Sequence, residues 1–315
     1  MFKKYENIIS DFDKFQKYVF SPGPEALRLN GLKIDPPNFL KTMKKCGYRV
    51  EQSPYFPDLY FWREKNCPAS ATVLHWAGYY YIQDPVTLLP VEALGLRPGE
   101  RVLDLCAAPG GKSFYMAELV GVDGCVVAND PSPPRRQILQ SNLQRLGAAN
   151  LMITSYQGQS VPENEKFAAI LVDAPCSGEG SNRWVDGDWP GVKKEQREQL
   201  IRTQYMLLKK AARLLAAGGR IVYSTCTYSP LENEAVVNRV LAESELEIAA
   251  IERNIPHDSG VCSWQGEDFA PGLKKMWRCY PHHYDGGGMV FALLKKRRQA
   301  PPDLEDDCRG DSSDE

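Results

Sequence analysis

Strand-like and helix-like patterns alternate along the chain from about residue 70 to residue 296. Short apolar runs typical of buried strands occupy residues 101–106, 124–130, 167–173, 220–224 and 289–294. A long amphipathic pattern from 193 to 215 is the clearest of the helices between them. Strands that alternate with helices form a parallel sheet covered on both faces. The pattern therefore predicts a doubly wound α/β domain, which we place at residues 69–297.

A smaller unit is expected at residues 1–68, because residues 26–30 resemble a strand and residues 38–46 a helix. This predicts an α+β module. Residues 1–49 carry ten Lys or Arg against five acids, which suits contact with phosphates. A solvated basic surface explains the same charge equally well.

The remaining composition limits the class of protein. Residues 298–315 are rich in proline and then acidic, which predicts a disordered tail. The chain has no run of eighteen apolar residues, so we expect no membrane span. Its start is too polar for a secretory signal, and its nine cysteines are irregularly spaced. We therefore expect a cytoplasmic protein with free thiols.

A glycine-rich turn follows the first predicted strand of the large domain, with the sequence CAAPGGKS at residues 106–113. This is where doubly wound sheets hold nucleotide-like ligands. A phosphate-binding loop would need glycine at Cys106, and a dinucleotide fingerprint would need separated glycines, so both matches fail. An adenosyl ligand without phosphates fits better, with Asp130 placed to bind its ribose. The alternative to a ligand-binding turn is a turn that needs glycine only for its backbone geometry.

Two cysteines follow neighbouring strands of the predicted sheet. The predicted strand at residues 167–173 ends at Asp173, and Cys176 follows it after Ala174 and Pro175. Cys226 follows the predicted strand at residues 220–224. Both would lie at the carboxyl edge of the sheet, beside the glycine-rich turn. Taken alone, either cysteine is more simply explained as a small buried residue. Together at corresponding positions, they indicate chemistry that uses two thiols.

Methylation of carbon 5 of a cytosine is such a chemistry. A thiolate that adds to carbon 6 makes carbon 5 nucleophilic, and a second group can then assist release of the product. Asp173 could hydrogen-bond the Watson–Crick edge of the base and neutralise charge on the ring. The target base must be unstacked, because carbons 5 and 6 are blocked within a helix.

These segments together resemble the Nol/Nop/Sun (Rsm-type) RNA cytosine-5 methyltransferases, and most of all their bacterial 16S ribosomal-RNA branch. The resemblance covers roughly residues 20–297. It is carried by YYIQDP at 80–85, LDLCAAPGGKS at 103–113, DAPCSGEG at 173–180, YSTCT at 223–227, ENE at 232–234, YPHH at 280–283 and GGGMV at 286–290. The resemblance implies a Rossmann-like methyltransferase sheet preceded by a small RNA-binding module.

The resemblance also implies roles for single residues. Cys226 would be the nucleophile, Cys176 would help to release the methylated base, and Asp173 would contact the base near the methyl donor. S-adenosyl-L-methionine would be wrapped by the turn, with Asp130 at its ribose and Arg135 beside it. The turn residues concerned are Cys106, Ala107, Ala108, Pro109, Gly110, Gly111 and Lys112.

Among the departures from the family pattern is the position near the adenine. Gln157 stands where relatives place an acid near the adenine, and an amide can still form a hydrogen bond there. No metal site is expected, since His282 and His283 are adjacent and lack the spacing of ligands.

Ribosomal RNA is the expected substrate, transfer RNA remains open, and a monomer is expected. Two other functions compete. A DNA cytosine-5 methyltransferase would attack with the Pro-Cys cysteine, Cys176, and would not pair it with a Thr-Cys motif such as that of Cys226. A non-catalytic RNA-binding or ribosome-assembly factor could keep the same fold without turnover.

Overall fold

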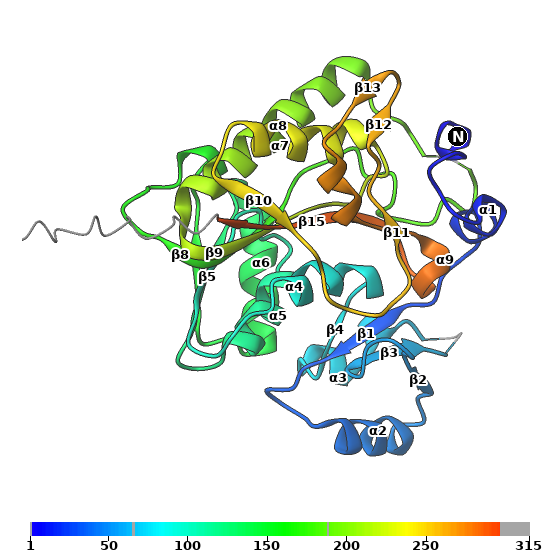
Figure 1. Cartoon of the computed structure of the whole chain (residues 1–315). Coiled ribbons are helices and arrows are strands. Elements are labelled where there is room, and N and C mark those ends of the chain that lie inside the picture. The colour runs from blue at the N-terminus through cyan, green and yellow to red at the C-terminus, as the bar shows by residue number, and fades with distance from the viewer. Residues whose placement is uncertain (1, 65–66, 188, 297–315) are drawn as a thin grey trace, which may run out of the picture.

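Five parallel strands form the centre of the molecule (Figure 1). Four of them match apolar runs predicted from the sequence, and the strand Leu151–Thr154 was not predicted. In a computed structural model, which describes residues 2–64, 67–187 and 189–296, the five strands lie in the order β7-β6-β5-β8-β9. Their bounds are β5 (Arg101–Asp104), β6 (Cys125–Asn129), β7 (Leu151–Thr154), β8 (Phe167–Asp173) and β9 (Leu215–Thr225). The expected neighbours β8 and β9 are paired in parallel, with Asp173 opposite Ser224.

Beyond β9 the sheet continues with strands that pair antiparallel with their neighbours. The last predicted strand is β15 (Met289–Lys296), which pairs antiparallel with β9, so the sheet is not wholly parallel, in contrast to the prediction. The others are β10 (Leu246–Ala249), β11 (Asp258–Ser259) and β14 (Trp277–Cys279), and a separate pair comprises β12 (Ser263–Trp264) and β13 (Glu267–Asp268). The sheet is therefore mixed, and its parallel half carries the glycine-rich turn and both predicted cysteines.

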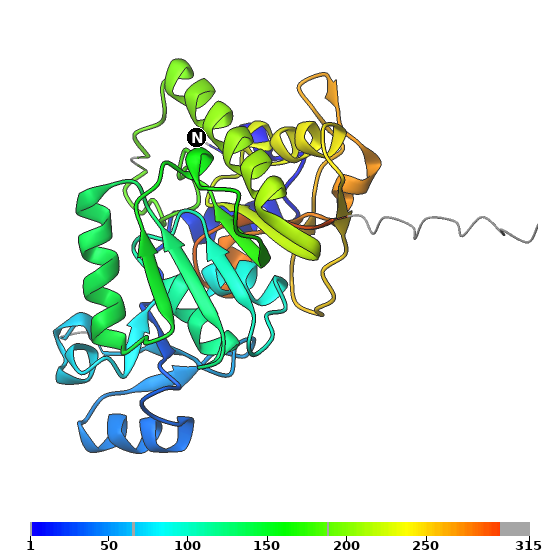
Figure 2. The ribbon, with the colours of Figure 1, turned by 90° about the vertical axis from the view of Figure 1, so that its left-hand side faces the viewer.

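Helices cover both faces of the sheet (Figure 2). Alternate strand residues point to opposite faces, so Leu103 and Ile170 pack beneath one helical layer, and Val102 and Leu171 pack beneath the other. The first layer comprises α7 (Lys194–Leu214) and α8 (Glu234–Ala242), and the second comprises α4 (Leu89–Ala93), α5 (Gly111–Val120) and α6 (Pro133–Leu146). This double cover explains why the parallel strands are continuously apolar.

The small N-terminal unit is a four-stranded antiparallel sheet in the order β2-β3-β1-β4, with α2 packed on it. Its strand β4 belongs to the segment after residue 68, so the sheet extends beyond the expected boundary. β4 pairs with β1, and this pairing ties the unit to the start of the large domain. The bounds are β1 (Ala26–Leu29), β2 (Val50–Gln52), β3 (Leu59–Trp62), β4 (Tyr80–Ile82), α2 (Pro36–Lys45) and α3 (Val73–Trp76).

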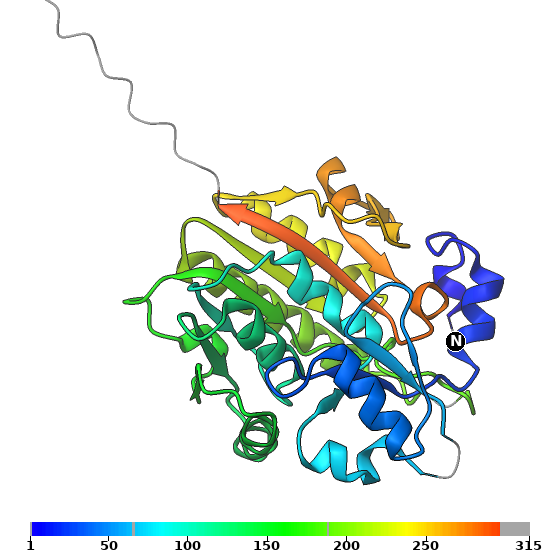
Figure 3. The ribbon, with the colours of Figure 1, turned by 90° about the horizontal axis from the view of Figure 1, so that it is seen from below.

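Residues 2–20 do not belong to this sheet. The short helix α1 (Phe12–Val19) lies beside α9 (Pro281–Tyr284), on the large domain (Figure 3). Phe2 and Phe15 are buried there against Tyr228 and Tyr280. Sequence patterns did not indicate this arrangement.

The predicted acidic tail at residues 298–315 lies outside the described residues. In the ranges that the structure does describe, we find no helix with both the length and the apolar character needed to cross a membrane.

Candidate functional site

The two cysteines meet where β8 and β9 end. Because these strands are parallel neighbours, the loops that follow them leave the same edge of the sheet. The Sγ atoms of Cys176 and Cys226 lie 3.3 Å apart and share a hydrogen bond. The predicted juxtaposition of the two thiols is therefore present.

The shared hydrogen bond makes the two thiols unequal. Donation from Cys176 lowers the pKa of Cys226, against the opposing effects of burial and the nearby Asp173 carboxylate. Lys112 adds a further lowering effect on this pKa. The same hydrogen bond, together with burial, raises the pKa of Cys176 well above its usual value. Cys226 is thus the thiol that ionises more readily, and Cys176 is the one that keeps its proton.

Asp173 lies between the cysteines and the glycine-rich turn. Its Oδ2 accepts a hydrogen bond from Lys112 Nζ at 2.8 Å, and its Oδ1 accepts one from Ser224 Oγ at 2.8 Å. Burial alone would lower the pKa of Lys112, but the Asp173 carboxylate outweighs burial and raises it. The pair fixes a carboxylate and a cation at the end of β8.

A cavity of about 270 Å³ extends from the cysteines to the end of β6. Most of the predicted site residues line it: Cys106, Ala108, Asp130, Arg135, Gln157, Asp173, Cys176 and Cys226. Asp130 is buried, and its Oδ2 accepts no hydrogen bond from any residue in the described ranges. Arg135 donates to the Ala108 carbonyl at 2.7 Å and so ties α6 to the turn. A buried carboxylate oxygen that can still accept hydrogen bonds fits a ligand with hydroxyl donors, such as a ribose.

The other turn residues face a second cavity of about 220 Å³. Ala107, Pro109, Gly110, Gly111 and Lys112 line it together with Tyr81, Asp84 and Asp173. A Cβ at Gly111 would lie 2.4 Å from Tyr81 Cε1, so this glycine is required for the packing of Tyr81. The turn therefore separates two cavities, and Asp173 borders both.

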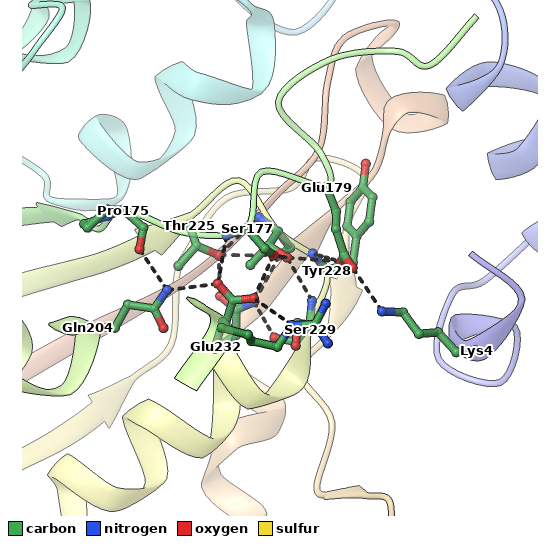
Figure 4. A network of polar contacts seen from close by, with 12 residues as sticks. Lys4, Pro175, Ser177, Glu179, Gln204, Thr225, Tyr228, Ser229 and Glu232 are labelled. Carbon is green, nitrogen blue, oxygen red and sulfur yellow. Dashed lines mark hydrogen bonds and ion pairs between the residues drawn. The ribbon is translucent and has the colours of Figure 1, made fainter. Parts of the chain in front are cut away.

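Two buried carboxylates that the sequence patterns did not single out hold the cysteine loops together (Figure 4). Glu232 accepts hydrogen bonds from the Ser177 amide at 2.9 Å and the Ser177 hydroxyl at 2.7 Å, beside Cys176. Glu179 accepts hydrogen bonds from Thr227 Oγ1 at 3.1 Å and the Tyr228 amide at 3.2 Å, beside Cys226. Both lie within the motifs quoted above, but no local pattern reveals partners that are tens of residues away.

Comparison with known proteins matches the chain to one family along most of its length. The family model described as 16S rRNA methyltransferase RsmB/F matches residues 91–295. The model described as the N-terminal domain of 16S rRNA methyltransferase RsmF matches residues 1–85.

Individual relatives are similar over nearly the whole chain. Ribosomal RNA small subunit methyltransferase F of Erwinia tasmaniensis is 33% identical over 313 residues, covering 95% of this chain and 63% of that protein. The 26S rRNA (cytosine-C(5))-methyltransferase nsun-1 of Caenorhabditis elegans is 35% identical over 288 residues, covering 89% of this chain and 43% of that protein. The chain thus spans less than two thirds of either relative.

A solved structure has the same architecture. The crystal structure of a methyltransferase homolog protein from Pyrococcus horikoshii superposes with a TM-score of 0.81 at 28% identity and covers 93% of each chain. The Rossmann-like methyltransferase fold expected from the sequence is thereby confirmed.

Proposed function

The chain belongs to the RsmB/F family of 16S rRNA methyltransferases, and on that premise we propose that it methylates carbon 5 of a cytosine in RNA. The reaction would proceed through a covalent adduct between Cys226 and the base. The observation that carries this proposal is the 3.3 Å pair of Cys176 and Cys226 beside Asp173, in which Cys226 is the thiol with the lowered pKa.

The cofactor of this proposal is S-adenosyl-L-methionine, which when bound would supply an electrophilic methyl group. Asp130, Arg135 and Gln157, with Cys106 and Ala108 of the turn, would hold it in the larger cavity. Asp130 Oδ2, which lies 3.5 Å from Arg135 Nη2 and accepts no hydrogen bond within the described residues, would accept one from a ribose hydroxyl.

The cysteines and Asp173 would act on the base in turn. The Cys226 thiolate adds to carbon 6, and the electron pair of the 5,6 double bond makes carbon 5 nucleophilic. Asp173 accepts a hydrogen bond from the exocyclic amine, and Lys112 stabilises negative charge that develops on the ring. After methylation, Cys176 relays the carbon 5 proton to solvent water, the electron pair of that C–H bond re-forms the double bond, and Cys226 leaves carbon 6 as a thiolate.

The substrate of the proposal is ribosomal RNA, in keeping with the names of both relatives, and transfer RNA is the second choice. The N-terminal module would contact the RNA through its basic residues. The proposal includes a monomer that acts in the cytoplasm, where the RNA is found.

Substitution of each cysteine tests the proposal. We expect Cys226→Ala to abolish methylation and to form no adduct, because no thiolate is left to attack carbon 6. Cys176→Ala should instead accumulate a covalent protein–RNA adduct, because release is impaired. The measurement is a denaturing gel of each variant after incubation with labelled RNA and S-adenosyl-L-methionine.

The rival functions give different results in the same experiment. An adduct that needs Cys176 and survives the loss of Cys226 would indicate the order used by DNA cytosine-5 methyltransferases. RNA binding by the wild-type protein with no methyl incorporation into any RNA would favour the assembly factor. Bisulfite sequencing of RNA from cells with and without the gene would then identify the modified cytosine.

A further inference from the structure

The N-terminal segment reaches the loop that follows Cys176. The Tyr5 hydroxyl donates a hydrogen bond of 2.7 Å to Glu179 Oε2, and Lys4 Nζ donates one of 3.0 Å to Glu179 Oε1. Tyr5 is fully buried, and burial beside the Glu179 carboxylate raises the pKa of its hydroxyl, so that it remains a donor. A buried hydroxyl that points inward cannot contact RNA at the surface.

Glu179 links this segment to the loop that carries Cys226. Its side chain is fully buried, and Oε2 also accepts the hydrogen bonds from Thr227 and Tyr228. An ionised carboxylate is costly to bury unless its hydrogen bonds and charge are satisfied. Lys4 is the cation that faces it, and Tyr5 supplies its shortest hydrogen bond.

Hydrogen bonds near Glu179 also join the loop that carries Cys176 directly to the loop that carries Cys226. The Gly180 amide donates to the Cys226 carbonyl at 2.8 Å, one residue after Glu179. The hydroxyls of Ser177 and Thr227, each next to a cysteine, lie 2.8 Å apart. A displacement of Glu179 would therefore move both loops and change the distance between the two Sγ atoms.

We propose that Lys4 and Tyr5 are positioning residues, which act through Glu179 to hold Cys176 and Cys226 at their reacting separation. The N-terminal segment, residues 2–20, is then part of the catalytic apparatus and is distinct in role from the RNA-binding module that follows it. The roles given to the cysteines rest on the function proposed above.

Two pairs of matched variants test this inference in the full-length protein. Tyr5→Phe removes only the hydroxyl that binds Glu179. Its control is Tyr60→Phe, since the buried Tyr60 hydroxyl has no hydrogen-bond partner in the part of the chain that the structure describes. Lys4→Ala removes the facing cation, and Lys3→Ala is the control because Lys3 is exposed and adjacent. Lys4→Arg should restore what Lys4→Ala loses.

Three measurements separate positioning from other roles. The first is kcat and KM for RNA, and the second is the unfolding midpoint. The third is the pH profile of Cys226 alkylation by iodoacetamide, measured by mass spectrometry of the peptide that contains Cys226. We expect Tyr5→Phe to lower kcat on the order of tenfold with little change in KM, because the misplaced cysteines fail in the transition state. Lys4→Ala should lower kcat by roughly threefold, because its ion pair is partly exposed.

The alkylation profile should move to higher pH in both variants, because a longer distance weakens the hydrogen bond that favours the Cys226 thiolate. The controls should retain the wild-type profile.

Other outcomes would overturn the inference. A higher KM with unchanged kcat and alkylation would make the segment an RNA contact. A lower unfolding midpoint with unchanged kcat and alkylation would make it a packing element only. Failure of the proposed function would look different: the wild-type protein would methylate no RNA, while the alkylation profiles would still report whether Lys4 and Tyr5 position Cys226.

Discussion

The two walls of the site are built in different ways. The cofactor wall is largely one continuous stretch, residues 104–113, which holds the end of β5 and the glycine-rich turn, and it is completed by Asp130 directly after the adjacent strand β6. The cysteine wall joins the loops after β8 and β9 with α7 and the N-terminal segment, through Glu179 and Glu232. The first wall is local, whereas the second exists only when distant segments meet.

This difference predicts how each wall responds to the loss of a side chain. The cofactor wall takes its shape from a backbone turn, so the protein should stay folded when one of its side chains is removed. The main loss should then be ligand affinity. A wall held by buried ion pairs and hydrogen bonds should lose folding free energy when one partner is removed.

The largest effect is expected for Glu234→Ala. This residue lies next to the cysteine wall, because its partner Arg278 donates a hydrogen bond of 3.0 Å to the Tyr228 carbonyl in the loop after β9. Glu234 receives hydrogen bonds of 2.7 and 2.6 Å from Arg278, and both side chains are fully buried. Without Glu234, the guanidinium would be buried with its charge uncompensated, at a cost of about 3–5 kcal/mol in unfolding free energy. Urea unfolding measures this cost.

Arg239→Ala is the matched control, because its ion pair with Glu243 is exposed and should contribute less than about 0.5 kcal/mol. A loss below about 1 kcal/mol for Glu234→Ala would contradict the contrast between the walls.

A smaller effect is expected for Asp104, the buried acid that begins the cofactor wall. Burial raises its pKa from 3.8 to about 6, while Ser113 Oγ donates to its Oδ2 at 2.7 Å. Between these pH values the folded chain keeps a proton that the unfolded chain has lost. The stability that this proton on Asp104 contributes is therefore fully present below pH 3.8 and is lost as the pH rises through about 6.

Unfolding measurements from pH 4 to pH 7 should show this loss, on the order of 2 kcal/mol, in the difference between the wild type and Asp104→Asn. A difference that does not change with pH would show that Asp104 is ionised throughout.

The smallest effect is expected for Asp130→Ala, and it should fall on the ligand. Loss of the carboxylate should weaken S-adenosyl-L-methionine binding roughly tenfold, because a buried acceptor for the ribose is removed. The unfolding free energy should change by less than about 1 kcal/mol. Isothermal titration calorimetry measures the affinity, and Asp123→Ala, an exposed acid in the loop after α5, is the control. Unchanged affinity in Asp130→Ala would remove the role proposed for this residue.

The sequence predicted four strands of the parallel half of the sheet, β5, β6, β8 and β9, because burial on both faces leaves apolar runs that can be recognised locally. It did not predict β7, in which no residue is fully buried. It placed Cys176 and Cys226 at neighbouring strand ends, and the pairing of β8 with β9 confirms that arrangement. It did not reveal that β4 completes the N-terminal sheet, because a three-residue strand carries too short a pattern. The roles given to the individual site residues stay predictions.

The sequence by itself determined the fold class, the glycine-rich turn and the two thiols, since each depends on residues that are close along the chain. Only the tertiary structure decided that Lys112 pairs with Asp173 and that the thiols of Cys176 and Cys226 share a hydrogen bond. It alone decided that Tyr5 reaches Glu179, which is 174 positions away. Local patterns reflect burial and backbone geometry, whereas a hydrogen bond between distant residues exists only after the chain has folded around it.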